Sequence, residues 1–120
     1  MILIQSNAAS LARWERLSDE QRTDFGRGHK KLTEELAASG HLVSSEGLAD
    51  PKLARHVSLR DGKVMTTDGP YAEAKEHLAG FYVVDCADFD EAVGIAARVP
   101  DVRLGGEVEV RPVFDLNQIG

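Results

Sequence analysis

A chain of 120 residues has room for one domain, spanning residues 1–120, with one core, and its 42% apolar and 28% charged residues are typical of a globular protein. The net charge of −6 argues against nucleic-acid binding, because affinity for a phosphate backbone depends on clustered Lys and Arg. No stretch approaches the roughly 20 apolar residues of a membrane helix, and the N-terminus has no basic signal-peptide region, so no membrane partner is expected. The single Cys86 allows no intramolecular disulfide, so we expect a cytoplasmic protein.

The N-terminal part of the chain predicts a strand, a helix and a second strand. The apolar run Ile2–Gln5 is typical of a buried strand. Ser18 with Gln21 three residues later forms a capping box, which begins the main helix, and Gly40 ends it as a left-handed C-cap. Residues 41–48 predict the next strand.

The main helix carries a histidine within its apolar stripe. Phe25, His29, Leu32 and Leu36 recur at the spacing of one helical face, so His29 is predicted to face the sheet. Gly28 costs about 1 kcal/mol of helix stability relative to Ala, and it removes side-chain bulk immediately before His29.

The dipeptide Asp61-Gly62 predicts a two-residue type I′ hairpin between two short strands. This turn fixes the register, and it places Val57, Leu59, Val64 and Thr66 on one face. The predicted cross-strand pairs are Arg60 with Lys63, Leu59 with Val64, Ser58 with Met65, and Val57 with Thr66.

Asp68 follows the apolar face of the hairpin by strict period two. Gly69 and Pro70 then predict a structural turn, in which Gly69 supplies a positive φ and Pro70 makes the loop rigid. Residues 71–77 predict a short helix with Pro70 at its first position.

The C-terminal part predicts a strand, a helix and a strand. Residues 78–84 are apolar on both faces, as a central strand would be. Asp88 is the expected N-cap of the second helix, which Pro100 ends, and residues 107–113 predict an alternating last strand.

The order β, α, β, hairpin, β, α, β predicts an α+β fold of ferredoxin-like topology with an additional β-hairpin. In that topology the first and third core strands are central, which agrees with their apolar character on both faces. Because two helices cover only one face of such a sheet, we expect a homodimer in which the uncovered faces of two sheets pack together as a dimeric α/β barrel.

The run Thr66–Tyr82, with Asp68-Gly69-Pro70-Tyr71 at its start, resembles the signature of the DGPF family of YCII-related proteins. The resemblance extends over nearly the whole chain, with Tyr71 in place of the usual Phe and Ala79-Gly80 in place of a Gly-Gly pair. It implies the ferredoxin-like, dimeric α/β-barrel fold. Some YCII-like proteins carry a His–Asp pair in a cleft, and some DGPF proteins are associated with sigma factors of transcription.

Two functions remain open. One is an acid/base enzyme of isomerase, lyase or dehalogenase type that acts on a small molecule. In this function His29 is the proton-transfer group, because imidazole exchanges protons near neutral pH, and Asp68 is its orienting carboxylate. The other is a non-catalytic ligand-binding or regulatory module linked to sigma-factor-dependent transcription, in which Asp68 serves only the turn and His29 is satisfied by neighbouring groups.

Three further residues are candidates for substrate binding. Tyr71 offers an aromatic wall and a hydroxyl, Glu46 offers a second acid at a strand end, and Lys75 offers an anion site. For each of them the commoner alternative is an ordinary role, namely packing for Tyr71, an exposed edge-strand position for Glu46 and a solvated helix face for Lys75. The four histidines and the single cysteine show no metal-ligand spacing and no phosphate-binding loop is present, so neither a metal nor another cofactor is expected.

Overall fold

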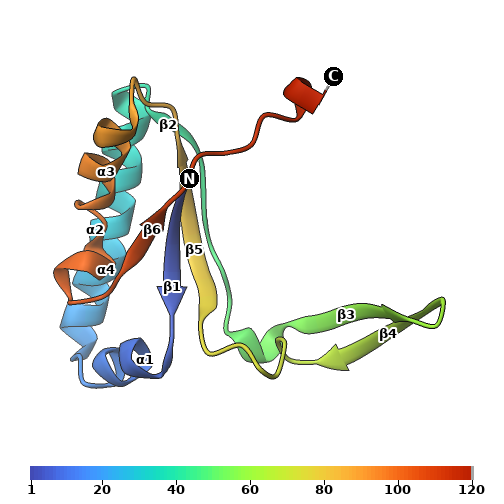
Figure 1. The fold of residues 1–120 in the computed structure, drawn as a ribbon. Helices are drawn as coiled ribbons and strands as arrows, with labels where there is room; N and C mark the ends of the chain where they lie inside the picture. Colours follow the sequence, from blue (N-terminus) through green and yellow to red (C-terminus); the bar gives the residue numbers. More distant parts are fainter. Residues whose placement is uncertain (120) are drawn as a thin grey trace.

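The computed structural model describes residues 1–119 as a four-stranded antiparallel sheet, with helices along one face and a separate two-stranded hairpin (Figure 1). The elements in chain order are β1 (Ile2–Ser6), α1 (Ala8–Glu15), α2 (Asp19–Ala38), β2 (Leu42–Gly47), the 3₁₀ turn η1 (Pro51–Leu53), β3 (Arg55–Arg60), β4 (Lys63–Asp68), β5 (His77–Val84), α3 (Phe89–Ala96), α4 (Pro100–Arg103), β6 (Val108–Val110) and the 3₁₀ turn η2 (Leu116–Ile119).

The four-stranded sheet has the order β2-β5-β1-β6, so β1 and β5 are central and β2 and β6 are edges. This order confirms the prediction from the apolar character of the central strands. The β1–β5 register pairs Ile2 with Tyr82 and Leu3 with Phe81, and a bulge follows Ile4.

Helix α2 begins and ends as its sequence predicts. The Ser18 hydroxyl accepts a hydrogen bond from the Gln21 N–H at 3.1 Å, and the Gln21 side chain accepts one from the Ser18 N–H at 2.8 Å. Gly40 follows the helix with φ 79°, a conformation that glycine adopts without steric cost. Among the described residues, no helix is long and apolar enough to cross a membrane.

The hydrophobic core lies between the sheet and the helices. Leu32 and Leu36 of α2 are buried there, which confirms the predicted stripe, and Phe25 and His29 are half-buried at its other end. Each fully buried aliphatic side chain contributes roughly 1.5–3 kcal/mol. The buried hydrophobic residues are Ile2, Ile4, Leu32, Leu36, Tyr82, Ile95, Ala96 and Val99.

The second face of the sheet, which we call the open face, carries apolar side chains on its central strands. Leu3 and Phe81 are paired on this face, and Val83 follows Phe81 two residues along β5; all three are half-buried. No α-helix lies on this side of the sheet in Figure 1. Within residues 1–119 the sheet does not close, so one chain does not form the expected barrel by itself.

The hairpin β3–β4 has the predicted register from Arg60–Lys63 to Val57–Thr66. Asp61 (φ 51°) and Gly62 (φ 76°) both have positive φ, as a type I′ turn requires. The hairpin leaves the sheet on the side opposite the helices and projects away from it (Figure 1).

Two local predictions were wrong. Residues 71–76 form turns and no helix: an i→i+3 bond joins the Ala74 N–H to the Tyr71 carbonyl at 3.0 Å, and β5 then begins at His77. The last strand comprises only Val108–Val110, although the Arg111 N–H still donates to the Met1 carbonyl at 2.9 Å.

Candidate functional site

Both ring nitrogens of His29 have partners in other elements. Nδ1 lies 2.6 Å from the Tyr82 hydroxyl oxygen, and Nε2 lies 2.8 Å from Asp101 Oδ1. The His29 and Asp101 side chains are 25% and 23% exposed, whereas Tyr82 is 3% exposed. The three side chains therefore form a hydrogen-bonded row from the core towards the surface.

The row depends on a close approach of α4 to α2. Asp101 lies in the first turn of α4, where a helix dipole favours a carboxylate, and Pro100 before it begins that helix. A Cβ atom at Gly28 would lie 3.0 Å from the Pro100 ring, so the absence of a side chain at Gly28 allows the ring to rest on α2. This contact brings the carboxylate of the next residue to the imidazole.

Aromatic rings extend the row towards α1. The Phe25 ring meets His29 edge-on with centroids 4.9 Å apart, and Trp14 meets Phe25 in the same way at 5.3 Å. The Arg22 guanidinium lies over Trp14 and donates two hydrogen bonds to the Trp14 carbonyl. One side of the His29 ring is therefore shielded by apolar surface.

The partners determine which proton each nitrogen carries. Asp101 accepts a hydrogen bond from Nε2–H, so in the neutral ring Nδ1 is the acceptor and the Tyr82 hydroxyl donates to it. Burial raises the pKa of Tyr82 above its ordinary value of 10.0, and the nearby Asp101 carboxylate adds to this effect, while a hydrogen bond with Thr33 opposes it. The phenol is therefore retained as a neutral donor.

A groove of about 520 Å³ runs between α2 and the segment that contains α4. Its apolar floor includes Leu17, Phe25 and Leu104, and its charged lining is mixed, with the basic residues Lys31, Arg98 and Arg103 and the acids Asp24 and Glu35. Gly28 and Pro100, the chain neighbours of His29 and Asp101, also line the groove. The groove therefore borders the two chain segments that carry His29 and Asp101.

The structure does not bring Asp68 to His29. Asp68 ends β4 with its side chain 96% exposed, and its carboxylate lies 3.8 Å from Arg55 of the neighbouring strand. The expectation that Asp68 orients His29 is wrong within one chain, because the hairpin on which it lies leaves the sheet on the side away from α2 (Figure 1). Asp101 occupies the place predicted for it.

The other residues expected at the site lie elsewhere. Gly69 has φ 86° and donates its N–H to the Ala54 carbonyl at 2.7 Å, so the predicted turn closes the base of the hairpin. Tyr71 is exposed against His56, with ring centroids 5.2 Å apart. Pro70 is half-buried and Lys75 is exposed.

Glu46 is also remote from His29. It is exposed on β2 and pairs with Phe81 on the open face. The expected substrate-binding residues therefore do not surround His29 within one chain.

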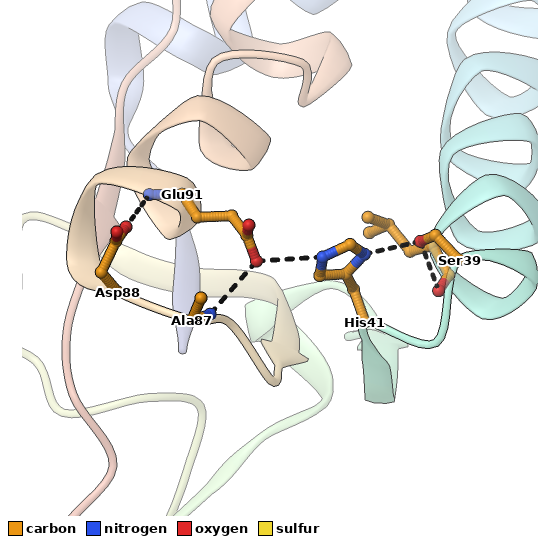
Figure 2. Close-up of polar contacts among 6 residues, drawn as sticks. Ser39, His41, Ala87, Asp88 and Glu91 are labelled. Atoms are coloured by element: carbon orange, nitrogen blue, oxygen red, sulfur yellow. Dashed lines mark hydrogen bonds and ion pairs between the residues drawn. The ribbon is translucent and has the colours of Figure 1, made fainter.

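A second histidine cluster joins the end of α2 to the start of α3 (Figure 2). The Ser39 hydroxyl oxygen lies 2.7 Å from His41 Nδ1, and His41 Nε2 lies 3.0 Å from Glu91 Oε1, which also accepts a hydrogen bond from the Ala87 N–H at 3.2 Å. This order of hydroxyl, imidazole and carboxylate resembles a nucleophilic triad.

Backbone geometry argues against acyl transfer at this cluster. The N–H groups of Ser39, Gly40 and His41 all donate to carbonyls of the last turns of α2, so none of these three faces an oxyanion beside the hydroxyl. We therefore assign Ser39, His41 and Glu91 a structural role in joining two helix ends.

Sequence reasoning missed Tyr82 and Asp101. Alternation along β5 places Tyr82 on the helix-facing side, where a buried phenol requires a hydrogen-bond partner, and this signal was available. Asp101 had no comparable signal, because its approach to His29 depends on how α4 packs against α2. Among residues 1–119, no group of three or more His, Cys, Asp or Glu side chains is arranged to hold a metal ion.

Comparison with known proteins gives a consistent classification. The family model of the YCII-related domain matches residues 1–117. The chain is also 32% identical over 116 residues to uncharacterized protein R00369 of Rhizobium meliloti (strain 1021), covering 93% of this chain and 89% of that protein. The chain therefore belongs to the YCII-related family.

Proposed function

We propose that this protein binds a small amphipathic carboxylic acid in the groove between α2 and α4. The observation that carries the proposal is the combination of an apolar floor with Arg103, which makes no ion pair among the described side chains, at the rim of a groove of about 520 Å³. This volume is within the usual range of ligand sites. An apolar ligand body would cover Leu17, Phe25 and Leu104, and its carboxylate would lie at the rim.

Arg103 is the cation best suited to hold the carboxylate. Arg98 is already paired with Glu35 at 2.6 Å, and Lys31 lies 3.8 Å from the same glutamate. Arg103 makes no ion pair with the side chains that the structure describes. A guanidinium forms bidentate hydrogen bonds with a carboxylate, which gives preference over an uncharged analogue.

A thermal-shift screen with aromatic and aliphatic carboxylates, each matched with its amide, tests the proposal. Carboxylates are expected to raise the melting temperature more than their amides, and Arg103→Gln is expected to remove that preference. Arg60→Gln, at the tip of the hairpin, is the matched control and should keep it. Equal responses to acids and amides would contradict the proposal.

The open face supports a second element of the proposal, assembly as a homodimer. Leu3, Phe81 and Val83 form a half-buried apolar strip on the central strands that no α-helix among residues 1–119 covers. A second copy would offer the same strip, and face-to-face packing of the two sheets would give the dimeric barrel of a ferredoxin-like domain.

Sedimentation velocity tests the dimer with a pair of matched variants. Val83→Glu places a carboxylate on the open face and should weaken dimerisation about ten-fold or more, because it buries a charge without a partner. Val93→Glu adds the same charge to an exposed position of α3, where it should leave the dimer unchanged. A wild-type monomer at tens of micromolar would refute the dimer.

A specific observation also favours a second function, acid/base catalysis. The His29 imidazole is partly exposed and contacts the Asp101 carboxylate at 2.8 Å, an arrangement that orients the ring. The pair that supports this function is His29–Asp101 rather than His29–Asp68. Against it, the Tyr82 hydroxyl occupies the accepting nitrogen, which a substrate would have to share.

Hydrogen exchange on carbon distinguishes binding from catalysis. A carboxylate found in the screen is incubated with the protein in D₂O, and loss of its carbon-bound protons is followed by NMR. Enzyme action predicts exchange that His29→Gln reduces by about 10²-fold or more while binding persists, with His56→Gln as the matched control. Binding without exchange would leave His29 with a structural role.

A further inference from the structure

The apolar side chains on one face of the hairpin β3–β4 are largely exposed within the described part of the chain. Val57, Leu59 and Val64 share one face of it and are 62%, 72% and 69% exposed. In the part of the chain that the structure describes, the hairpin pairs with no other strand, and an isolated two-stranded hairpin is only marginally stable in water. Its apolar face therefore requires a partner.

The overall dimensions of the chain show how far the hairpin extends. The radius of gyration is 16.7 Å, whereas a compact domain of 120 residues has about 14 Å. The hairpin projects on the side of the open face, opposite the helices, so the hairpin and the open face form two sides of a corner (Figure 1).

The length of the hairpin suits a second chain placed in that corner. Two packed sheets lie about 10 Å apart, and six residues of extended strand, as in Arg55–Arg60, span about 20 Å. A hairpin of this length reaches beyond the sheet of a partner chain that covers the open face.

The charge of the hairpin fits the same partner. It carries the basic residues Arg55, Arg60 and Lys63 against two acids, Asp61 and Asp68, so it is net positive. The whole chain has a net charge of −6, so the remainder of a second copy is strongly negative. The opposite charges of the hairpin and of the rest of the chain favour association between copies of this chain.

We propose that the β3–β4 hairpin is an arm that closes over the flank of a second copy of this chain, with its apolar face against the partner. The inference rests on the face-to-face dimer of the proposed function and adds a second contact surface to it. Two-fold symmetry makes the contact reciprocal, so each chain gives one arm and receives another.

A double variant with a matched control tests the arm by sedimentation. Leu59→Ser with Val64→Ser removes two apolar side chains that lie opposite each other on the apolar face. The dimer dissociation constant should rise about ten-fold or more, because that area is no longer withdrawn from water. Met65→Ser, on the opposite face of the same hairpin, should leave the constant unchanged.

Hydrogen exchange of the peptide that covers residues 55–68 gives an independent readout. These amides should exchange more slowly above the dissociation constant than below it, since the arm is held only in the dimer. A wild-type dimer whose hairpin exchanges equally fast at both concentrations, or whose affinity the double variant leaves unchanged, would overturn the arm and leave the dimer standing. A wild-type monomer would overturn both.

Discussion

Tyr82 is buried in the core and yet carries a hydroxyl that must be satisfied. His29 Nδ1 accepts a hydrogen bond from this hydroxyl, and no buried side-chain nitrogen or oxygen among the described residues lacks a partner. Breaking such a contact leaves an unsatisfied polar atom, which costs about 1–3 kcal/mol. The same network therefore serves stability whether or not His29 has a chemical role.

Tyr82→Phe should alter the response of stability to alkaline pH. The pKa of Tyr82 is raised from 10.0 in the folded state, so the folded protein retains the phenol proton more strongly than the unfolded chain does. This contribution is complete below pH 10 and is lost as the pH rises through the folded pKa. Urea unfolding should therefore show a steeper alkaline loss of stability in the wild type than in Tyr82→Phe.

Tyr71→Phe is the control for that experiment, because Tyr71 is 52% exposed. It should keep the wild-type steepness. Identical alkaline profiles for the wild type and Tyr82→Phe would show that Tyr82 does not stay protonated in the way its burial indicates.

Glu91→Gln should make Cys86 more reactive. Partial burial raises the pKa of the Cys86 thiol, and the Glu91 carboxylate raises it further. Removing that negative charge favours the thiolate, which is the reactive form. Alkylation by iodoacetamide at about pH 8 should become several-fold faster in Glu91→Gln and remain unchanged in Glu109→Gln; an unchanged rate in both would contradict the electrostatic effect of Glu91.

At the level of residues, the sequence predicted where His29 points but not its partner. Helical periodicity suffices for the first, because it depends only on α2. The contact with Asp101 depends on the packing of a four-residue helix that is distant in sequence, and periodicity does not determine such packing.

At the level of elements, the sequence was most informative where structure is local. The capping box at Ser18 and the type I′ turn at Asp61-Gly62 each depend on a few neighbouring residues, and both were predicted correctly. The helix predicted over residues 71–77 does not form. Seven residues make too few helical hydrogen bonds to fix a helix without packing, and Tyr71 at its start is exposed.

Gly80→Ala should weaken the pairing of β2 with β5. A Cβ atom at Gly80 would lie 2.9 Å from the Glu46 carbonyl oxygen, so the two strands would have to separate. Gly94→Ala on α3 is the matched control, since its Cβ would meet nothing within 4 Å and alanine favours a helix. Urea unfolding should show a loss of about 1–3 kcal/mol for Gly80→Ala and a small increase for Gly94→Ala. Equal stabilities of Gly80→Ala and the wild type would contradict the close approach of the strands.

At the level of the whole molecule, the chain is broad and thin, with extents of 48 × 48 × 19 Å. Such a shape exposes much of its apolar surface, including one sheet face and the hairpin. The sequence predicted the uncovered face. Apolar residues on both sides of β1 and β5 require packing partners on both sides of the sheet, and the helices cover only one side. It did not predict the direction of the hairpin, which follows from the turns at its base.

The melting temperature should therefore depend on protein concentration. A dimer that dissociates on unfolding is stabilised by mass action, so its midpoint rises as concentration rises. Differential scanning calorimetry over a hundred-fold range should show this increase for the wild type and a smaller one for Val83→Glu. A midpoint independent of concentration would indicate that the chain unfolds as a monomer.

Gly28 sets the distance between two helices that carry the His29 network. A methyl group there would strengthen α2 as an isolated helix and at the same time press against the Pro100 ring. A side chain at residue 28 would thus stabilise the helix itself but move Asp101 away from His29. A substitution at residue 28 can therefore change the distance between the His29 ring and the Asp101 carboxylate without any change in the side chains that contact the ring.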